Sequence, residues 1–200
     1  MTLKLNETIA RKVLETVDAG LVNGMGKPVP GQMCVEAAVC FAYGLPHSDN
    51  PPCVGSAVRS FKIKLNDARW SSVAARTQGM RALAIAQLGS DAIDQLAFAK
   101  MVTEGAIRVI VPMAMRRAAE MAKEPHKATL LAVADHCENE GTPEAAQAAR
   151  DAAYAYACAA AAVYRDSVLN ACADIGLQAL IALDSPGCKY LFLLDEEVEA

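Results

Sequence analysis

Apolar residues recur every three to four positions along most of this chain, a spacing that places them on one face of an α-helix. The first example is Ile9, Val13 and Val17, with Asn6 placed to cap the helix and Gly20 placed to end it. The same spacing predicts further helices over residues 32–43, 53–65, 71–88, 91–101, 107–121 and 126–137. We find no segment with the apolar–polar alternation of a half-buried strand. The chain is therefore predicted to be all-α, with many helices packed as a bundle-like globular domain.

An alanine-rich tract dominates the C-terminal part of the chain. It begins at Thr142-Pro143-Glu144, which combines a hydroxyl cap, a proline at the first helical position and an acid near the positive end of the helix dipole. We expect one long helix from there to about residue 183, with a bend near Gly176. Residues 1–140 are expected to form a globular helical portion. The long helix and a short C-terminal helix, residues 141–200, are expected to pack on it as one domain.

Composition favours the same fold and bears on location. Apolar residues make up 54% of the chain and aromatic residues only 5%, so the core must consist of small and aliphatic side chains, which suit packed helices better than strands. There is no run of 18 strongly apolar residues, and the first residues lack the apolar segment of a secretory signal. We therefore expect a cytoplasmic protein without a membrane contact or cofactor. Its seven cysteines are expected to be reduced and to fill space as small hydrophobic residues.

Residues 26–56 hold much of what could carry chemistry: three of the seven cysteines, one of the three histidines and five of the nine prolines. Cys34 falls in the predicted first turn of a helix, where unpaired N–H groups and the helix dipole lower the pKa of a thiol. A cysteine-dependent hydrolase or transferase would use Cys34 as the nucleophile, His47 as the base and Asp49 to orient that base. The alternative groups are Gln32 as an oxyanion donor, His126 or His136 as the base, and Asp135 as its partner.

The segment GQMCVEAA, residues 31–38, resembles the nucleophile helix of papain-like hydrolases. The resemblance covers only these residues and implies a nucleophile at Cys34, followed along the chain by a histidine and a carboxylate. This chain departs from the family's pattern because it lacks the small residues around the cysteine and the strand-rich region that carries the histidine. A thiol that packs against Ala38 and Phe41 explains Cys34 equally well.

Cysteine and histidine are also zinc ligands, so the same segment raises the question of a metal site. Cys34 and Cys40 are six positions apart and would point about 120° apart on one helix, so they cannot share an ion. Cys40, His47 and Cys53 can converge only if the intervening loop folds back. Because no pair has the C-x₂₋₄-C spacing of zinc sites, we expect no metal.

Residues 53–81 form a basic segment with a net charge of +5. Two helices joined by a short corner are the arrangement of a helix-turn-helix, and Trp70 at that corner can stack on a base or pack the corner. The segment is therefore a candidate polyanion-binding surface. The competing interpretation, favoured because the whole chain has a net charge of −4, is that these charges are solvated or paired with acids. The basic residues are Arg59, Lys62, Lys64, Arg69, Arg76 and Arg81.

Two further features favour helical faces that bind a protein partner or a second copy of the chain. Methionine, which adapts to irregular apolar contacts, recurs at Met101, Met113, Met115 and Met121. Charge is also divided along the chain, with +5 over residues 1–134 and −9 over residues 135–200. We therefore expect a non-enzymatic helical protein–protein interaction or regulatory module. A cysteine-dependent enzyme and a nucleic-acid-binding protein are the alternatives.

Overall fold

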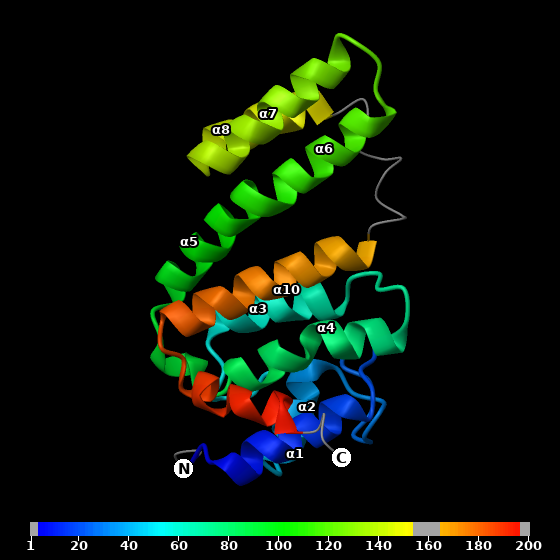
Figure 1. Ribbon diagram of the computed structural model, residues 1–200. Coiled ribbons are helices and arrows are strands. Elements are labelled where there is room, and N and C mark those ends of the chain that lie inside the picture. Colours follow the sequence, from blue (N-terminus) through cyan, green and yellow to red (C-terminus); the bar gives the residue numbers. More distant parts are fainter. Residues whose placement is uncertain (1–3, 154–164, 197–200) are drawn as a thin grey trace. The chain divides into compact units, whose positions relative to one another are not determined.

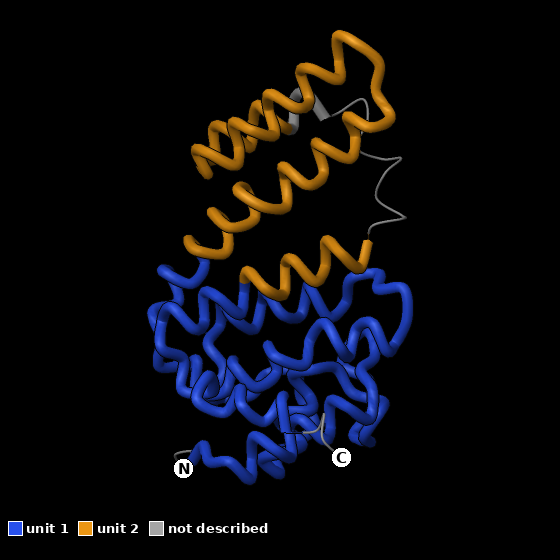
Figure 2. The backbone as a smooth tube through the Cα atoms, viewed as in Figure 1, with its two compact units in different colours: residues 1–99, 176–200 blue, residues 100–175 orange. Residues whose placement is uncertain are grey.

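The computed structural model describes residues 4–153 and 165–196 and divides into two compact units (Figures 1 and 2). Unit 1 comprises residues 1–99 and 176–200, and unit 2 comprises residues 100–175. Within the described ranges the chain forms helices, with two isolated β-bridges in a loop and no strand. The predicted all-α fold is confirmed. The boundary expected at residue 140 falls inside unit 2, between two of its helices.

The helices of unit 1 begin where the sequence supplies a side chain to cap them. Asn6 Oδ1 accepts a hydrogen bond from the Ile9 N–H, and Ser72 Oγ accepts one from the Ala75 N–H. The elements of this unit are α1 (Glu7–Asp18), α2 (Val35–Ala42), α3 (Ser56–Asn66), α4 (Val73–Ala86), the 3₁₀ helices η1 (Ser90–Ala92) and η3 (Pro186–Leu194), the start of α5 (Gln95–Gly105) and the end of α10 (Arg165–Ala182).

The core of unit 1 forms where α1 packs against α2 and α4, α2 packs against α3, and η3 packs against α4. Its fully buried side chains are mainly aliphatic, as the composition indicated, and include Val13, Val17, Val39, Leu83 and Leu88. Trp70, the single tryptophan of the chain, is 6% exposed and donates its indole N–H to the Leu65 carbonyl. It therefore packs the corner between α3 and α4.

The C-terminal segment completes unit 1 through a close backbone approach to α4. Ser185 Oγ donates a hydrogen bond of 2.6 Å to the Ala86 carbonyl. Gly187 lies so near the end of α4 that an added Cβ would be 2.1 Å from the Ile85 carbonyl oxygen. This contact is possible only for glycine, because the neighbouring atoms belong to the backbone and cannot turn away.

Unit 2 comprises the remainder of α5, the π-helical turn η2 (Ala106–Ile110), α6 (Val111–Met121), α7 (His126–Glu140), α8 (Pro143–Ala153) and the start of α10. Pro112 lies in the first turn of α6, and the π-turn η2 directly precedes this helix. From this turn Arg108 donates hydrogen bonds to the last carbonyls of α7, at Glu138, Asn139 and Glu140. Met115 is buried in this unit's core, whereas Met121 is 75% exposed.

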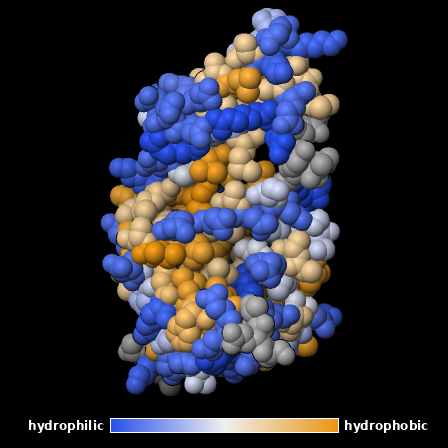
Figure 3. Space-filling model, viewed as in Figure 1, coloured by the Kyte–Doolittle hydropathy of each residue, from blue (hydrophilic) through white to orange (hydrophobic). Residues whose placement is uncertain are grey.

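The predicted long alanine-rich helix corresponds to α8 and α10, but residues 154–164 lie outside the described residues. Gly176, the expected bend, lies within α10 and allows the Phe61 ring to approach closely. No helix within residues 4–153 and 165–196 combines the length and apolar character required to cross a membrane. On the face of unit 1 shown in Figure 3, hydrophilic residues are interspersed with hydrophobic ones.

We expect Gly187→Ala to reduce the stability of unit 1 by about 1–3 kcal/mol, because the new methyl group must displace the backbone of α4. Urea unfolding followed by Trp70 fluorescence measures this unit specifically. Gly44→Asn is the matched control: Gly44 has a φ of +67° with nothing within 4 Å of an added Cβ, and asparagine tolerates that conformation. Equal effects of the two substitutions would contradict the proposed backbone contact.

Candidate functional site

A buried ion pair joins α2 to α3. Lys62 Nζ lies 3.3 Å from Glu36 Oε1, and both side chains are 0% exposed. Apart from this contact, neither carboxylate oxygen of Glu36 nor the ammonium nitrogen of Lys62 has a hydrogen-bond partner within the described residues. Buried charges are normally both paired and hydrogen-bonded, since removing them from water is costly. This incompletely satisfied pair is therefore the feature of unit 1 that most requires an explanation.

A small, partly open cavity of about 60 Å³ lies against Glu36. By this measure a water molecule needs about 10–15 Å³, so the cavity has room for a few waters or one small polar group. The residues around it include three acids, a cysteine and an asparagine. The lining residues are Gly24, Met25, Cys34, Val35, Glu36, Asp49, Ile63, Asn66 and Asp67.

The end of α3 holds one wall of this cavity in place. Asn66 Nδ2 donates hydrogen bonds of 2.9 Å to the Val22 carbonyl and to Asp67 Oδ1. Asp67 Oδ1 also accepts a bond of 2.7 Å from the Gly24 N–H. These bonds tie the loop that precedes α2 to the last turn of α3, so α2, α3 and the loop position the cavity together.

Cys34 caps α2 and does not have the chemistry expected of a nucleophile. Its Sγ accepts a hydrogen bond of 3.4 Å from the Ala37 N–H, and the residue is 5% exposed. Burial raises the pKa of the Cys34 thiol, and hydrogen bonds from the N–H groups of Ala37 and Glu36 offset this only in part. The predicted lowering of this pKa is therefore wrong, because desolvation outweighs the helix terminus. Burial likewise raises the pKa of Cys40, to about 11.

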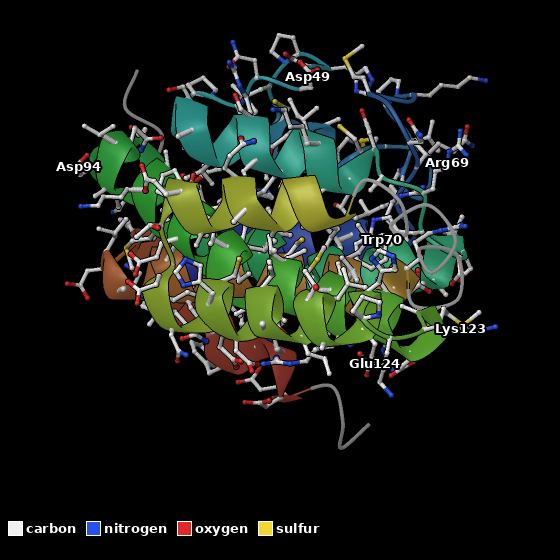
Figure 4. The ribbon with its side chains drawn as sticks, turned by 90° about the horizontal axis from the view of Figure 1, so that it is seen from above. Asp49, Arg69, Trp70, Asp94, Lys123 and Glu124 are labelled. Atoms are coloured by element: carbon white, nitrogen blue, oxygen red, sulfur yellow. The ribbon has the colours of Figure 1, made fainter. Side chains whose placement is uncertain are left out.

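His47 and Asp49 lie near the cavity without forming a hydrogen-bonded triad with Cys34. The half-buried His47 ring places Nε2 3.1 Å from the Gly26 carbonyl oxygen, so it contacts the loop before α2. Asp49 is exposed at the rim of the cavity and lies at the edge of the view in Figure 4. No hydrogen bond between His47 and Cys34 is found within the described residues. A catalytic role for Cys34, His47 and Asp49 thus stays a prediction.

The alternative catalytic groups are not gathered at this cavity. Gln32 is exposed and does not line it. His126, His136 and Asp135 belong to unit 2, whereas Cys34 belongs to unit 1.

The cysteines and histidines that the structure describes do not form a recognisable metal centre. Within the described ranges, no group of three or more His, Cys, Asp or Glu side chains is arranged to hold a metal ion. Cys40 and Cys53 are buried thiols without a disulfide. His47 contacts a backbone carbonyl, as described above.

The basic segment does not present one exposed cationic face. Lys62 is fully buried against Glu36. Arg76 donates to the carbonyls of Asn66 and Leu21, and Arg81 forms an ion pair with Asp18. Lys64 and Arg69 are exposed and Arg59 is half-buried; Figure 4 shows Arg69 at the periphery. A polyanion-binding surface would need Lys62 to be exposed with the other basic residues, whereas its side chain is buried and paired with Glu36.

Sequence reasoning placed Cys34 and Asp49 among the candidates but missed Glu36, Asn66 and Asp67. A signal for Glu36 was present: it is the only charged residue between Met33 and Tyr43, in a segment that is otherwise apolar. A lone acid within an apolar helix is typical of a buried charge with a specific partner.

We expect Glu36→Gln and Lys62→Met each to destabilise unit 1 by about 3–5 kcal/mol, because each leaves one buried charge unpaired. The double variant Glu36→Gln/Lys62→Met should lose less than either single variant, since no charge remains buried. Urea unfolding monitored by Trp70 fluorescence completes this double-mutant cycle. Additive losses would show that the two side chains do not interact.

The pH dependence of the two single variants should run in opposite directions. Burial is the main influence on both groups: it raises the pKa of Glu36 and lowers the pKa of Lys62. In Lys62→Met, Glu36 can therefore bind a proton in the folded state, and the deficit relative to wild type should shrink as pH falls towards 4. In Glu36→Gln, Lys62 can lose its proton, and the deficit should shrink as pH rises towards 10.

Alkylation should find Cys34 and Cys40 slow to react. A thiol of pKa about 11 has roughly a hundred-fold less thiolate at pH 8 than one of pKa 9.0, and both residues are also shielded from solvent. Peptide mapping after iodoacetamide treatment measures the rate at each site, with urea-unfolded protein as the control. Native Cys34 that reacts as fast as a free thiol below pH 7 would restore it as a nucleophile.

No family model matches the chain, and no curated protein or solved structure matches it either. The chemistry of the cavity over Glu36 is therefore the basis on which a function is inferred.

Proposed function

We propose that this protein is a non-enzymatic regulatory module that binds a small polar ligand in the cavity of unit 1. The observation that carries the proposal is the small cavity among polar residues beside the buried Glu36–Lys62 pair, whose charged atoms have no hydrogen-bond partner within the described residues other than each other. A ligand in this cavity would hydrogen-bond the polar groups of α2, α3 and the loop before α2 that line it. Binding would then stabilise the folded arrangement of α2 and α3.

A binding role fits the site better than thiol catalysis. A nucleophilic cysteine requires a lowered pKa and a base within hydrogen-bond reach. Cys34 has a raised pKa and serves as a helix cap, while His47 contacts the Gly26 carbonyl. The contacts of both residues therefore favour structural roles.

A regulatory role is supported by the loop between α1 and α2, which forms part of the cavity wall. This loop contributes Gly24 and Met25 to the lining and is tied to Asp67. It also exposes apolar side chains, with Met25 42% and Val29 45% exposed. A ligand in the cavity would contact the same loop that offers these apolar side chains to a protein partner, so occupancy and partner binding would be coupled.

The proposal is tested by a ligand-observed NMR screen of small amines, amino acids, carboxylates and polyols against the whole chain. We expect at least one compound to bind to wild type and to bind at least tenfold more weakly to Asp49→Arg. The new side chain starts at the exposed rim and is long enough to place its guanidinium at the cavity mouth. Asn50→Arg, at the neighbouring exposed position that does not line the cavity, is the matched control and should change affinity less than twofold. Equal effects of the two substitutions, or no ligand at all, would refute the proposal.

A further inference from the structure

Three exposed aliphatic side chains lie where the loop before α2 meets the start of α4. Met25, Val29 and Val73 are 42%, 45% and 52% exposed. Val73 belongs with the loop, because a Cβ added at Gly20 would lie 3.4 Å from Val73 Cγ1 and 3.7 Å from the Gly31 Cα. Exposed aliphatic side chains that adjoin one another, unlike scattered ones, mark a surface that binds a partner.

Basic side chains flank these apolar ones. Lys27 lies between Met25 and Val29 in the loop, and Arg69 lies in the corner between α3 and α4, four residues before Val73. Both cations are exposed, and neither forms an ion pair within the described residues. Figure 4 shows Arg69 at the periphery, next to the blue loop that precedes α2. We call these five residues the loop–corner surface.

Hydrogen bonds hold the loop against the corner. The Gly24 N–H donates a bond of 2.7 Å to Asp67 Oδ1, at the end of α3. From α4, Arg76 donates to the carbonyls of Asn66 and Leu21, at 2.9 and 3.2 Å. Because the loop and α4 are both tied to the end of α3, the loop–corner surface is already ordered, which lowers the entropy cost of binding a partner.

The charge of the loop–corner surface is positive. Residues 19–35 and 68–90, which supply it, contain no Asp or Glu. Two acids adjoin it: Asp49 lines the same cavity as Met25, and Asp67 Oδ1 already accepts hydrogen bonds from the loop and from α3. Three bases outnumber these two acids, so the surface is complementary to an anionic partner. The bases are Lys27, Arg69 and Arg76.

The combination of aliphatic and basic side chains selects the kind of partner. Nucleic acid would satisfy the cations but would leave the three aliphatic side chains facing phosphates and sugars. A protein segment can match both, with apolar side chains against Met25, Val29 and Val73 and carboxylates beside the two exposed cations.

We propose that the loop–corner surface binds a segment of a partner protein that carries both acidic and aliphatic side chains. This inference rests on the proposed function, which assigns the loop before α2 to partner binding, and adds the chemistry of the partner.

Titration of the whole ¹⁵N-labelled chain with short defined peptides tests the inference. A peptide of leucine and glutamate should shift the amide signals of Met25, Lys27 and Val29 with a dissociation constant on the order of 0.1 mM, as expected of a small, transient contact. Peptides of leucine and lysine, or of serine and glutamate, should bind at least tenfold more weakly, because they lack the negative charge or the apolar side chains. Added salt should weaken binding, since it screens exposed charges.

Substitutions locate the site. Lys27→Glu should weaken binding of the leucine–glutamate peptide at least tenfold, because an attraction becomes a repulsion. Lys4→Glu is the matched control and should change affinity less than twofold. Lys4 is also exposed, but it precedes α1 whereas the loop follows it, and the 12 residues of this helix span about 18 Å. Val29→Ser, which keeps every charge, should weaken binding about two- to fivefold through lost apolar contact.

The possible failures are distinguishable. A leucine–glutamate peptide that does not bind, or that binds equally to Lys27→Glu and Lys4→Glu, overturns the inference. A single-stranded DNA oligonucleotide that binds more tightly than the peptide, with loss of affinity in Lys27→Glu, assigns the surface to nucleic acid instead. Self-association of the chain that Lys27→Glu abolishes assigns it to a second copy.

The ligand screen separates these failures from a failure of the proposed function. If the screen finds a cavity ligand and the peptide does not bind, only the inference fails. If the peptide binds as expected and the screen finds no ligand, the proposed ligand-binding function fails and the loop–corner surface is retained. If neither binds, both fail.

Discussion

The contact between Glu36 and Lys62 is the constraint on which unit 1 most depends. At 3.3 Å, and with an effective dielectric constant of about 20, the attraction is about 5 kcal/mol, while each buried ion loses several kcal/mol of hydration. These opposing terms leave little net stabilisation. The pair does restrict how the two helices pack, because any displacement of α2 along α3 would separate the two charges inside the protein, where water cannot solvate them. The position of α2 beside α3 is therefore determined by the free-energy cost of separating the two charges as much as by apolar contacts.

The cavity follows from that condition and from the loop that closes over it. Once α2 is held by its second residue, its N-terminus meets the end of α3, where Asn66 and Asp67 bind the backbone of the loop at Val22 and Gly24. The Cys34 thiol caps α2 at the same place. Three requirements thus meet in one region: a buried charge, a helix start and a loop attachment. Aliphatic side chains cannot fill the space between these polar groups without leaving them unsatisfied, which is why a polar cavity remains.

Much of the helical framework could be predicted from the sequence, since helix ends are local. Asn6 and Ser72 cap the helices that their positions predicted, and Gly141 ends α7 with a φ of +65°. Cys34 and Asp49, which the sequence singled out, both line the cavity of unit 1. Glu36 could not be assigned in the same way. Its burial depends on Lys62, which comes from another helix, and the sequence pattern counted Lys62 among surface cations. The sign of the pKa shift at Cys34 was missed for the same reason: the helix terminus is local, whereas desolvation is set by tertiary packing.

Several charges of the unevenly charged chain form ion pairs within each unit. Arg11 pairs with Glu196 within unit 1, and Arg116 pairs with Asp135 and Glu138 within unit 2. These pairs are exposed, so salt screens them and each contributes little. The Glu36 carboxylate differs because it is shielded from both water and salt. Its attraction to Lys62, 3.3 Å away, is therefore not screened as the attractions within the exposed pairs are.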